Sequence, residues 1–389
     1  MPYRKASTAA IVAPCFVNGL HLVRELARKG AYTVAADCNP TSIAFRSRYA
    51  RECVVLPDPR KEEGALADLL LKRRDLYGGL VVPSDDAYLR EVHSHWDELS
   101  RHYRLAVSPG KSTAIALDKD RAYQAAAEAG LLCPQTIEIE SAADLPSAIG
   151  QTGLPAILRA AFSLDFVKDF ACKSFFVTSL DEAKARLDQA LASGHRMLLQ
   201  EVVPGPDRLI VSCRGYAYDS GELSPMVCSS KRLQYPPLFG ISNINESIFL
   251  PEIAQMTTRL LKHLGVRGTI FSNEFKYDRR TGAFKFIELN CRSVLSTGFA
   301  KYSGVDLVEH LWRDKMGLPP PVSRLRLHRR WTYIKDALLR HRGYPQHRLS
   351  AREYWRLYRP PIGLALFDAR DLRPFLLDIK PLIFRRLKL

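Results

Sequence analysis

The sequence predicts an α/β protein that begins with a parallel sheet covered by helices and continues into a larger α+β region. Three observations carry this prediction. Short apolar runs alternate with helical segments near the N-terminus, an apolar hairpin surrounds the turn "DRRTG", and basic residues gather towards the C-terminal end. Strand–helix alternation is typical of parallel sheets packed against helices. We therefore expect three regions, at 1–107, 108–320 and 321–389.

The first region has the pattern of a β-α-β unit followed by further strands. Apolar runs at 8–14 and 31–40 flank an amphipathic helical segment at 18–30, and more apolar runs lie at 52–57 and 78–86. The turn "APCFVNG" after the first run lacks GxGxxG, whose glycines let the backbone approach a pyrophosphate. A dinucleotide site is therefore not expected there.

The second region mixes helices with β-rich runs. Helices are predicted at 118–130 and 250–265 from their apolar periodicity. Strands are predicted where apolar, β-branched and aromatic residues gather; these runs lie at 154–160, 172–179, 196–205, 208–218, 268–278 and 283–291. The third region is expected to be a small helical appendage.

Composition excludes several classes of protein. Of the 389 residues, 47% are hydrophobic and 25% are charged, which is a globular balance. No apolar run reaches the roughly 18 residues that a membrane-spanning helix needs, and the N-terminal segment lacks a signal-peptide pattern. The eight cysteines show no CxxC spacing. We expect free thiols in a reducing, cytoplasmic compartment, without a zinc site.

Positive charge is concentrated at the C-terminal end. The formal net charge is +16, and residues 322–389 hold 17 lysines and arginines against 5 acidic residues. Such a field favours anionic partners: a phospholipid surface, a polyanionic substrate or nucleic acid. No nucleic-acid-binding motif accompanies the charge, so nucleic acid is the least favoured of the three.

The segment "FKFIELNCRS" places polar side chains at every second position of a predicted strand. Glu288, Asn290 and Arg292 should therefore point to one face. A hairpin symmetric about Thr281 sets Glu274 opposite Glu288, and facing carboxylates repel each other. A divalent cation resolves the conflict, because two carboxylates and an amide oxygen are hard ligands for Mg²⁺. The alternative is a solvated strand face, and a slip of one residue would separate the carboxylates.

Five separated motifs resemble those of ATP-grasp enzymes and occur in the family's order over residues 8–315. "NEFKYDRRTGAFKFIELNCR" resembles the metal-binding hairpin, with Cys291 in place of the usual proline. The others are "LDKDRAYQAAAEAGLLCPQT" at the opening helix, "LPAILRA" at a phosphate-binding strand, "LLQEVVPGPD" at the adenine hinge, and "STGFAKYSGVDLVEHLW" at a helical segment typical of carboxylate–amine ligases. The tail is similar to that of D-aspartate-ligase-like proteins.

The resemblance implies an ATP-grasp fold and a set of site residues. A Rossmann-like domain would occupy 1–107, an ATP-grasp domain 108–320 with a lid at about 125–200, and a basic helical region 321–389. ATP phosphates would be held by Lys119, Arg159 and Lys173; adenine and ribose by Glu201, Val203 and Asp207; Mg²⁺ or Mn²⁺ by Glu274, Glu288 and Asn290; the acyl phosphate by Arg292; and the acceptor or γ-phosphate by Lys231 and Arg232.

Two departures from the family's pattern bear on activity. Arg159 stands where a lysine is usual, and a planar guanidinium does not replace an ammonium atom for atom. The following segment, predicted as a loop at 161–173, lacks the usual glycines and carries phenylalanines instead.

The resemblance implies an ATP- and Mg²⁺-dependent ligase that joins a small-molecule carboxylate to an amine through an acyl phosphate. The alternative is a degenerate nucleotide-binding sensor, docked to a membrane or polymer by its tail. The basic and apolar residues that end the chain suit peripheral attachment to an anionic membrane or polymer. A tail packed on its own domain is the competing expectation.

Overall fold

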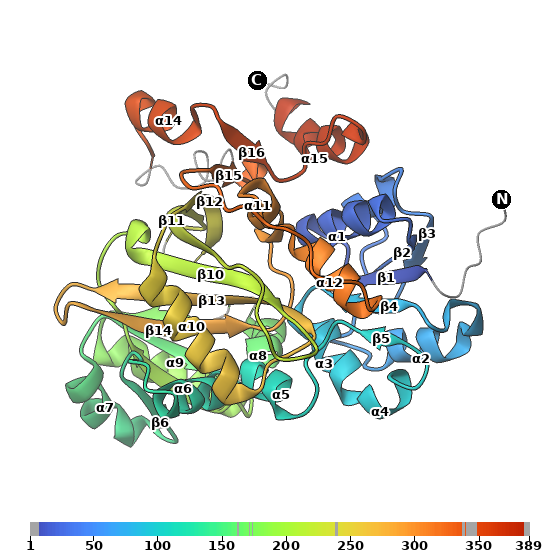
Figure 1. Cartoon of the computed structure of the whole chain (residues 1–389). Coiled ribbons are helices and arrows are strands. Elements are labelled where there is room, and N and C mark those ends of the chain that lie inside the picture. The colour runs from blue at the N-terminus through green and yellow to red at the C-terminus, as the bar shows by residue number, and fades with distance from the viewer. Residues whose placement is uncertain are drawn as a thin grey trace.

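The computed structural model describes residues 8–161, 163–170, 172, 174–237, 240–336, 339 and 348–384. Figure 1 shows an N-terminal sheet on one side of the molecule, a central sheet in the middle and a small sheet beneath it. The last part of the chain runs across the top of the central sheet, and helix α15 lies above helix α1.

The N-terminal sheet is parallel, as strand–helix alternation predicts. Its strand order is β3-β2-β1-β4-β5, and every residue of the central strand β1 is buried. Such strands are covered on both faces, which explains their near-continuous apolar composition. The elements are β1 (Ala9–Ala13), α1 (Val17–Arg28), β2 (Tyr32–Asp37), η1 (Ile43–Arg46), β3 (Glu52–Val55), α2 (Ala65–Lys72), η2 (Arg74–Leu76), β4 (Leu80–Pro83), α3 (Asp86–Ser94), α4 (Trp96–Leu99), β5 (Arg104–Leu105) and α5 (Lys111–Leu117).

The small sheet is antiparallel, with the order β6-β9-β7-β8. One face packs on helices α7 and α9 around Leu158, Leu187 and Leu199. Because strand side chains alternate, Arg159 and Gln200 belong to the opposite face. The elements here are α6 (Lys119–Glu128), β6 (Thr136–Ile139), η3 (Ala142–Asp144), α7 (Leu145–Thr152), β7 (Ala156–Ala160), α8 (Ser163–Phe170), β8 (Phe175–Val177), α9 (Leu180–Ala192) and β9 (Met197–Glu201).

The central sheet has the order β14-β13-β10-β11-β12-β15-β16. One of its faces is apolar: Phe271, Phe275 and Phe286 pack there against helices α6 and α10. The elements are η4 (Asp207–Leu209), β10 (Ile210–Ala217), β11 (Val227–Tyr235), β12 (Ile241–Ser247), α10 (Pro251–Leu264), β13 (Thr269–Asp278), β14 (Ala283–Asn290), α11 (Thr297–Tyr302), α12 (Leu307–Lys315), β15 (Arg330–Thr332), α14 (Ala351–Tyr358), β16 (Ile362–Leu364) and α15 (Leu372–Phe384).

The predicted register of the β13–β14 hairpin is confirmed at its carboxylates. Glu274 pairs directly with Glu288. A register shift follows, so that Phe275 pairs with Phe286 rather than with Ile287. Beyond this irregularity the pairing is not centred on Thr281, because one extra residue lies in β14.

The expectation of a purely helical C-terminal region was wrong. Strands β15 and β16 extend the central sheet, β15 antiparallel to β12 and β16 parallel to β15. Three-residue strands inside a basic segment give little periodic signal, and the edge of β12 supplies unpaired backbone groups for them. The described part of the tail also packs on its own N-terminal domain. There Arg24 Nε donates to Asp371 Oδ2 at 2.8 Å, and both side chains are buried.

The prediction of a loop at 161–173 was also wrong, because most of this glycine-poor segment forms helix α8. Phe166 is fully buried, and its ring contacts those of Phe170, Phe175 and His195. The phenylalanines therefore build the core of the small sheet's domain. The proposed phosphate ligand Lys173 lies outside the described residues.

The N-terminal and central sheets share one core. Leu20 and Leu26 of α1 belong to the same buried cluster as Phe299, Leu311 and Trp331. The two parts are thus joined by apolar packing as well as by polar contacts. Within the described ranges, no helix is long and apolar enough to cross a membrane.

Candidate active site

Polar side chains gather on the second face of the central sheet. Ser212 of β10 pairs with Glu274 of β13, which in turn pairs with Glu288 of β14. Directly paired residues project to the same face, and so do residues two positions away along a strand. Arg214 and Asn290 therefore share this face. We use the name cleft for the region over this face, which Lys119 of α6 borders through its ion pair with Glu288.

Each of the two facing carboxylates is paired with a lysine from another element. Lys119 Nζ lies 2.5 Å from Glu288 Oε1, and Lys231 Nζ lies 3.2 Å from the Glu274 carboxylate. The side chain of Lys231 is only 5% exposed and that of Lys119 15%. These two ammonium groups offset the repulsion that the sequence placed between the carboxylates.

The donor set in the cleft fits a magnesium ion in its chemistry. Glu274, Glu288 and the Asn290 side chain supply hard oxygen atoms on one face. Across the described ranges, no three His, Cys, Asp or Glu side chains cluster as a self-sufficient metal site. Mg²⁺ characteristically takes only one or two carboxylates when substrate phosphates complete its coordination. Two glutamates are therefore sufficient if a nucleotide binds beside them.

Lys119 is positioned by the start of helix α6. The Asp118 side chain caps this helix by accepting from the backbone of Asp120 and Arg121, which fixes the neighbouring residue. Burial lowers the pKa of the Lys119 ammonium, and the negative charge of Glu288 opposes that effect. An ammonium group buried in this way interacts strongly with any anion that replaces water in the cleft.

Arg159 faces the cleft from strand β7 of the small sheet. Its Nη1 donates to Gln200 Oε1 at 3.1 Å and to the Tyr123 hydroxyl at 3.4 Å. Its buried Nε has no hydrogen-bond partner among the described residues. Two neutral acceptors leave its positive charge uncompensated, so the guanidinium remains available to an anion.

The hinge after β9 joins the small sheet to the central sheet. The Glu201 carboxylate accepts from Lys285 Nζ at 2.7 Å and from the Gln135 amide at 3.0 Å, and it pairs with Arg280. Burial raises the pKa of this carboxyl, but the hydrogen bonds from Lys285 and Gln135 outweigh burial and hold the pKa below its usual value. Glu201 thus acts as an anchor between sheets, and Val203 beyond it is buried.

Asp207, the expected ribose ligand, lies in η4 at the end of this hinge. Its Oδ1 accepts from Gln234 Nε2 of β11 at 2.9 Å. Lys276 of β13 lies on the same face as Glu274, and burial lowers the pKa of its ammonium while Asp207 opposes that effect. The structure therefore places Asp207 at the border of the cleft.

Arg292 is held by the N-terminal domain. Its Nε and Nη2 donate to the two carboxylate oxygens of Asp86 at 2.6 and 2.7 Å. Asp86 begins helix α3, whose N-cap is Asp85; the Asp85 side chain accepts from the Tyr88 amide at 2.9 Å. Burial raises the pKa of the Asp85 carboxyl to about 6. The bidentate pair fixes Arg292 at the junction of the two domains.

A cavity of about 710 Å³ opens beside this junction, at the carboxyl ends of β1, β2 and β4. Asp85 lines it together with Asp37, Arg60 and Lys335. The carboxyl edge of a parallel sheet, where the strand order reverses, is the usual ligand-binding position in such folds. Its mixed charges suit a small molecule with both an acidic and a basic group.

The structure does not bring all expected residues together. Lys231 reaches Glu274 in the cleft, whereas Arg232 pairs with Glu246 at 3.1 Å and lines a different cavity. Adjacent strand residues project to opposite faces, so the two could not both serve the cleft.

Sequence reasoning missed two cationic residues on the cleft face. Arg214 is fully buried, and its Nε and Nη1 have no hydrogen-bond partner among the described residues. Burial lowers the pKa of its guanidinium to about 10. A lone arginine in the apolar run "RLIVSCRGYAY" was the available signal. Lys276 is the second missed residue. It lies two positions after Glu274 in the predicted strand, a spacing that places both side chains on one face.

Comparisons with known proteins point to one fold. No protein-family model matches the chain. It is 22% identical over 255 residues to a D-aspartate ligase from Enterococcus faecium, an alignment that covers 63% of this chain and 60% of the ligase. The chain thus spans less than two thirds of the length of that curated relative.

Solved structures cover more of the chain. An N5-carboxyaminoimidazole synthetase from Staphylococcus aureus superposes with a TM-score of 0.64 at 13% identity, covering 89% of both chains. An L-amino acid ligase from Bacillus licheniformis gives a TM-score of 0.61 at 13% identity, covering 80% of this chain and 75% of the ligase. The structural likeness confirms the ATP-grasp fold predicted from the sequence.

Proposed function

We propose that this chain, which has the ATP-grasp fold, is an ATP- and Mg²⁺-dependent ligase that activates a carboxylate as an acyl phosphate and joins it to an amine. One observation carries the proposal: Glu274 and Glu288 face each other in the cleft, each beside a buried lysine. Acids and cations buried at this density are characteristic of a site that handles phosphate charge.

The ATP phosphates would lie between the central sheet and the small sheet. Lys119 approaches from α6 and Arg159 from β7, so cations meet the phosphates from two directions. Phosphoryl transfer leaves negative charge on the transferring oxygens, and fixed cations in a dry site stabilise that charge without reorganising. Arg214 and Lys276 add positive charge on the same face.

Glu274, Glu288 and Asn290 would hold Mg²⁺ or Mn²⁺, which would supply positive charge to neutralise the phosphates. Lys119 and Lys231 already contact these carboxylates and are therefore near the phosphates as well. The adenine would lie against the hinge backbone near Val203, and Asp207 would contact the ribose. Glu201 supports the hinge through its pairs with Lys285 and Arg280.

The chemistry then proceeds in two balanced steps. An oxygen of the substrate carboxylate attacks the γ-phosphorus, and ADP leaves. The amine nitrogen attacks the carbonyl carbon of the acyl phosphate, inorganic phosphate leaves and the amine loses a proton. Arg292, whose Nε and Nη2 are held by Asp86, would contact the acyl phosphate through its remaining N–H groups.

An amino acid is the favoured substrate class. Two of the similar proteins are named as ligases of D-aspartate and of L-amino acids, and the 710 Å³ cavity near Arg292 offers both acidic and basic side chains. One carboxylate and one amine per reaction would enter from this side of the cleft. A larger anionic acceptor, such as a cell-envelope precursor, would use the same entrance.

A phosphate-release screen tests the proposal. Purified protein is incubated with Mg²⁺-ATP and pairs of D- and L-amino acids, and both phosphate and the amide product are measured. We expect phosphate release that requires both substrates and yields product in equal amount. Release without product, or no release with any pair while nucleotide binds, would contradict a ligase.

A second candidate is a nucleotide sensor that binds ATP without turnover. It is favoured by helix α8, where buried Phe166 stiffens a segment that carries no glycine. The same screen separates the two candidates, because a sensor binds ATP by calorimetry but releases no phosphate. A cytoplasmic location with peripheral membrane contact would suit either function. The eight cysteines, all free, are compatible with a reducing compartment.

A further inference from the structure

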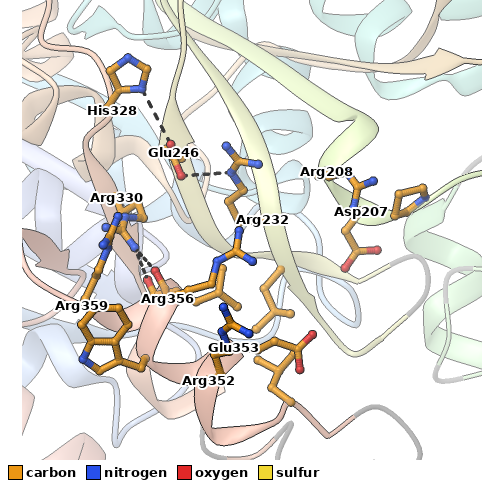
Figure 2. A pocket seen from close by; sticks show the side chains of 15 residues that line it. Asp207, Arg208, Arg232, Glu246, His328, Arg330, Arg352, Glu353, Arg356 and Arg359 are labelled. Carbon is orange, nitrogen blue, oxygen red and sulfur yellow. Dashed lines mark hydrogen bonds and ion pairs between the residues drawn. The ribbon is translucent and has the colours of Figure 1, made fainter.

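A second charged cavity lies at the C-terminal end of strand β11, beside Arg232 and Leu233 and against helix α14. Its volume is about 1080 Å³, and its walls come from η4, β11, β12, β15 and α14. Figure 2 shows side chains from the strands and from the helix entering the same space. We name it the arginine cavity after six of its lining residues: Arg208, Arg232, Arg330, Arg352, Arg356 and Arg359.

Positive charge exceeds negative charge in this cavity. Six arginines and His328 line it, against only three carboxylates, those of Asp207, Glu246 and Glu353. Arginine keeps its charge at any ordinary pH, and its planar group forms paired hydrogen bonds with phosphate or carboxylate. The cavity therefore has an excess of three positive charges before His328 is counted.

The three carboxylates are already engaged. Glu246 pairs with Arg232 at 3.1 Å and lies 3.9 Å from His328. Glu353 accepts from the backbone and the hydroxyl of Ser350, closing the capping box of helix α14. Asp207 accepts from Gln234. Of the three, only Glu246 forms an ion pair with a lining arginine in the described part of the chain.

Some of the arginines have structural tasks. Arg330 donates to the backbone carbonyls of Arg356 and Leu357 at the end of α14. The Arg359 guanidinium lies over the ring of Trp355, 5.5 Å from its centroid, within the roughly 6 Å over which a cation and an aromatic ring attract each other. These contacts fix the helix against the central sheet, so the cavity wall is held in place.

Three arginines have neither a side-chain hydrogen bond nor a ring contact among the described residues: Arg208, Arg352 and Arg356. Arg352 and Arg356 are four residues apart on α14, a spacing at which like charges destabilise a helix. In Figure 2 these two point from the helix into the space, while Arg208 stands on the η4 side. Cations from opposite walls thus converge on one volume.

We propose that the arginine cavity binds a ligand carrying several phosphate groups, at a site separate from the ATP cleft. Three uncompensated guanidinium groups match the charge of a di- or triphosphate, and the volume admits a ligand larger than the phosphates alone. Trp355, with 65% of its surface exposed, offers a flat apolar surface at the cavity rim. Solvated surface arginines are the competing account, but they would not need to converge from separate elements.

The cavity is coupled to the hinge of the cleft. The Ser230 hydroxyl of β11 donates to the Arg208 carbonyl at 2.9 Å, and Gln234 of the same strand holds Asp207. An occupant that draws Arg208 inward therefore acts on η4, next to the proposed nucleoside site. Asp207 lines the cavity and is also the proposed ribose ligand, so the two sites adjoin there. The proposal does not depend on the ligase reaction, because Arg208, Arg352 and Arg356 are not part of the proposed ATP site.

Titration calorimetry with inorganic tripolyphosphate tests the proposal on the full chain. We expect wild-type protein to bind it, with pyrophosphate weaker and phosphate weakest, and with affinity falling as salt rises. The double variant Arg352→Gln/Arg356→Gln should bind at least tenfold more weakly. Arg208→Gln, on the opposite wall, should also weaken binding. Because Arg208 lies outside α14, a loss of binding in this variant cannot come from misfolding of that helix.

A matched control removes two exposed arginines elsewhere, as Arg74→Gln/Arg101→Gln, and should bind like wild type. Co-sedimentation with phosphatidylglycerol and phosphatidylcholine vesicles then identifies the source of the phosphates. Binding of free tripolyphosphate indicates a soluble ligand; binding only to phosphatidylglycerol, lost in the same variants, indicates a lipid headgroup. No binding to either probe, or equal binding by the cavity variants and the control, would overturn the proposal.

Discussion

The cleft and the arginine cavity are both charged, but in the cleft both of the facing carboxylates are paired with lysines. In the cleft, Glu288 contacts Lys119 and Glu274 contacts Lys231. In the cavity, cations outnumber carboxylates two to one even before His328 is counted. Neighbouring residues of one strand divide between the regions, since Lys231 serves the cleft and Arg232 the cavity.

The difference follows from burial. A buried ion without a partner costs several kcal/mol. In the cleft the pairs of Lys119 with Glu288 and of Lys231 with Glu274 limit that cost, whereas buried Arg214 retains it. The open cavity leaves Arg352 and Arg356 exposed to water, where an unpaired guanidinium costs little. Paired, partly buried charges suit a preorganised active site. Unpaired, solvated cations suit a site that binds an anionic ligand.

The largest effect is expected from a neutralised cleft carboxylate. Glu288→Gln removes a proposed metal ligand without changing its shape, so Mg²⁺-dependent turnover should fall about 100-fold or more. Glu246→Gln, the matching change on the cavity side, should leave turnover within about twofold. Steady-state phosphate release measures both. Wild-type turnover by Glu288→Gln at saturating Mg²⁺ would remove the metal assignment.

Nucleotide affinity should depend on Arg159. Because its guanidinium has only neutral partners in the structure, Arg159→Ala should weaken ATP binding about tenfold, whereas Arg159→Lys, which keeps the charge, should retain it. Calorimetry with ATP compares both variants with Arg121→Ala, which removes an exposed arginine from α6. If Arg159→Ala binds as tightly as that control, Arg159 does not contact phosphate.

A substitution at Arg214 tests whether a buried charge in the cleft lowers the stability of the protein. Its buried guanidinium lacks partners for two nitrogens, so Arg214→Met should leave the unfolding free energy unchanged or raise it by up to about 2 kcal/mol. Turnover should fall, because positive charge beside Glu274 is lost. Denaturant unfolding and phosphate release are measured together. A loss of stability with unchanged turnover would make Arg214 a structural residue only.

A smaller effect is expected where the tail meets the N-terminal domain. Burial and the nearby Asp378 raise the pKa of the Asp336 carboxyl to about 7. Its folded-state pKa therefore exceeds its unfolded value near 3.9, so its contribution to stability is present below about pH 4 and is lost as pH rises to 7. Asp336→Asn should be equal to wild type in stability at pH 4 and more stable than wild type at pH 8, as thermal unfolding would show. Parallel pH profiles for the two proteins would contradict the shift.

Much of the fold could be predicted because its signals are local. The turn "DRRTG" and the alternation beside it located the hairpin and set Glu274 opposite Glu288. The irregularity after Glu274 left no trace in the pattern, since one extra residue in a strand does not alter its composition. Strands β15 and β16 were not predicted because each has only three residues, and because β15 depends on β12 for its partner and β16 depends on β15.

The site was harder to predict because its partners are distant in sequence. Asp86 and Arg292 are 206 residues apart, and nothing local to either of them indicates the pair. The division between Lys231 and Arg232 depends on which face of β11 each takes, near an irregular stretch of the β11–β12 ladder. Arg214 could have been found, because a lone charge inside an apolar strand requires a reason.

The metal dependence of ADP binding tests the central claim most directly, because it needs no substrate and no turnover. ADP is titrated into wild type and into Glu274→Gln/Glu288→Gln, with and without Mg²⁺, and Glu246→Gln serves as the control from the arginine cavity. The structure predicts that Mg²⁺ tightens ADP binding in wild type and in the control, and that this gain disappears in the double variant. An equal gain in all three proteins would contradict the placement of nucleotide and metal in the cleft.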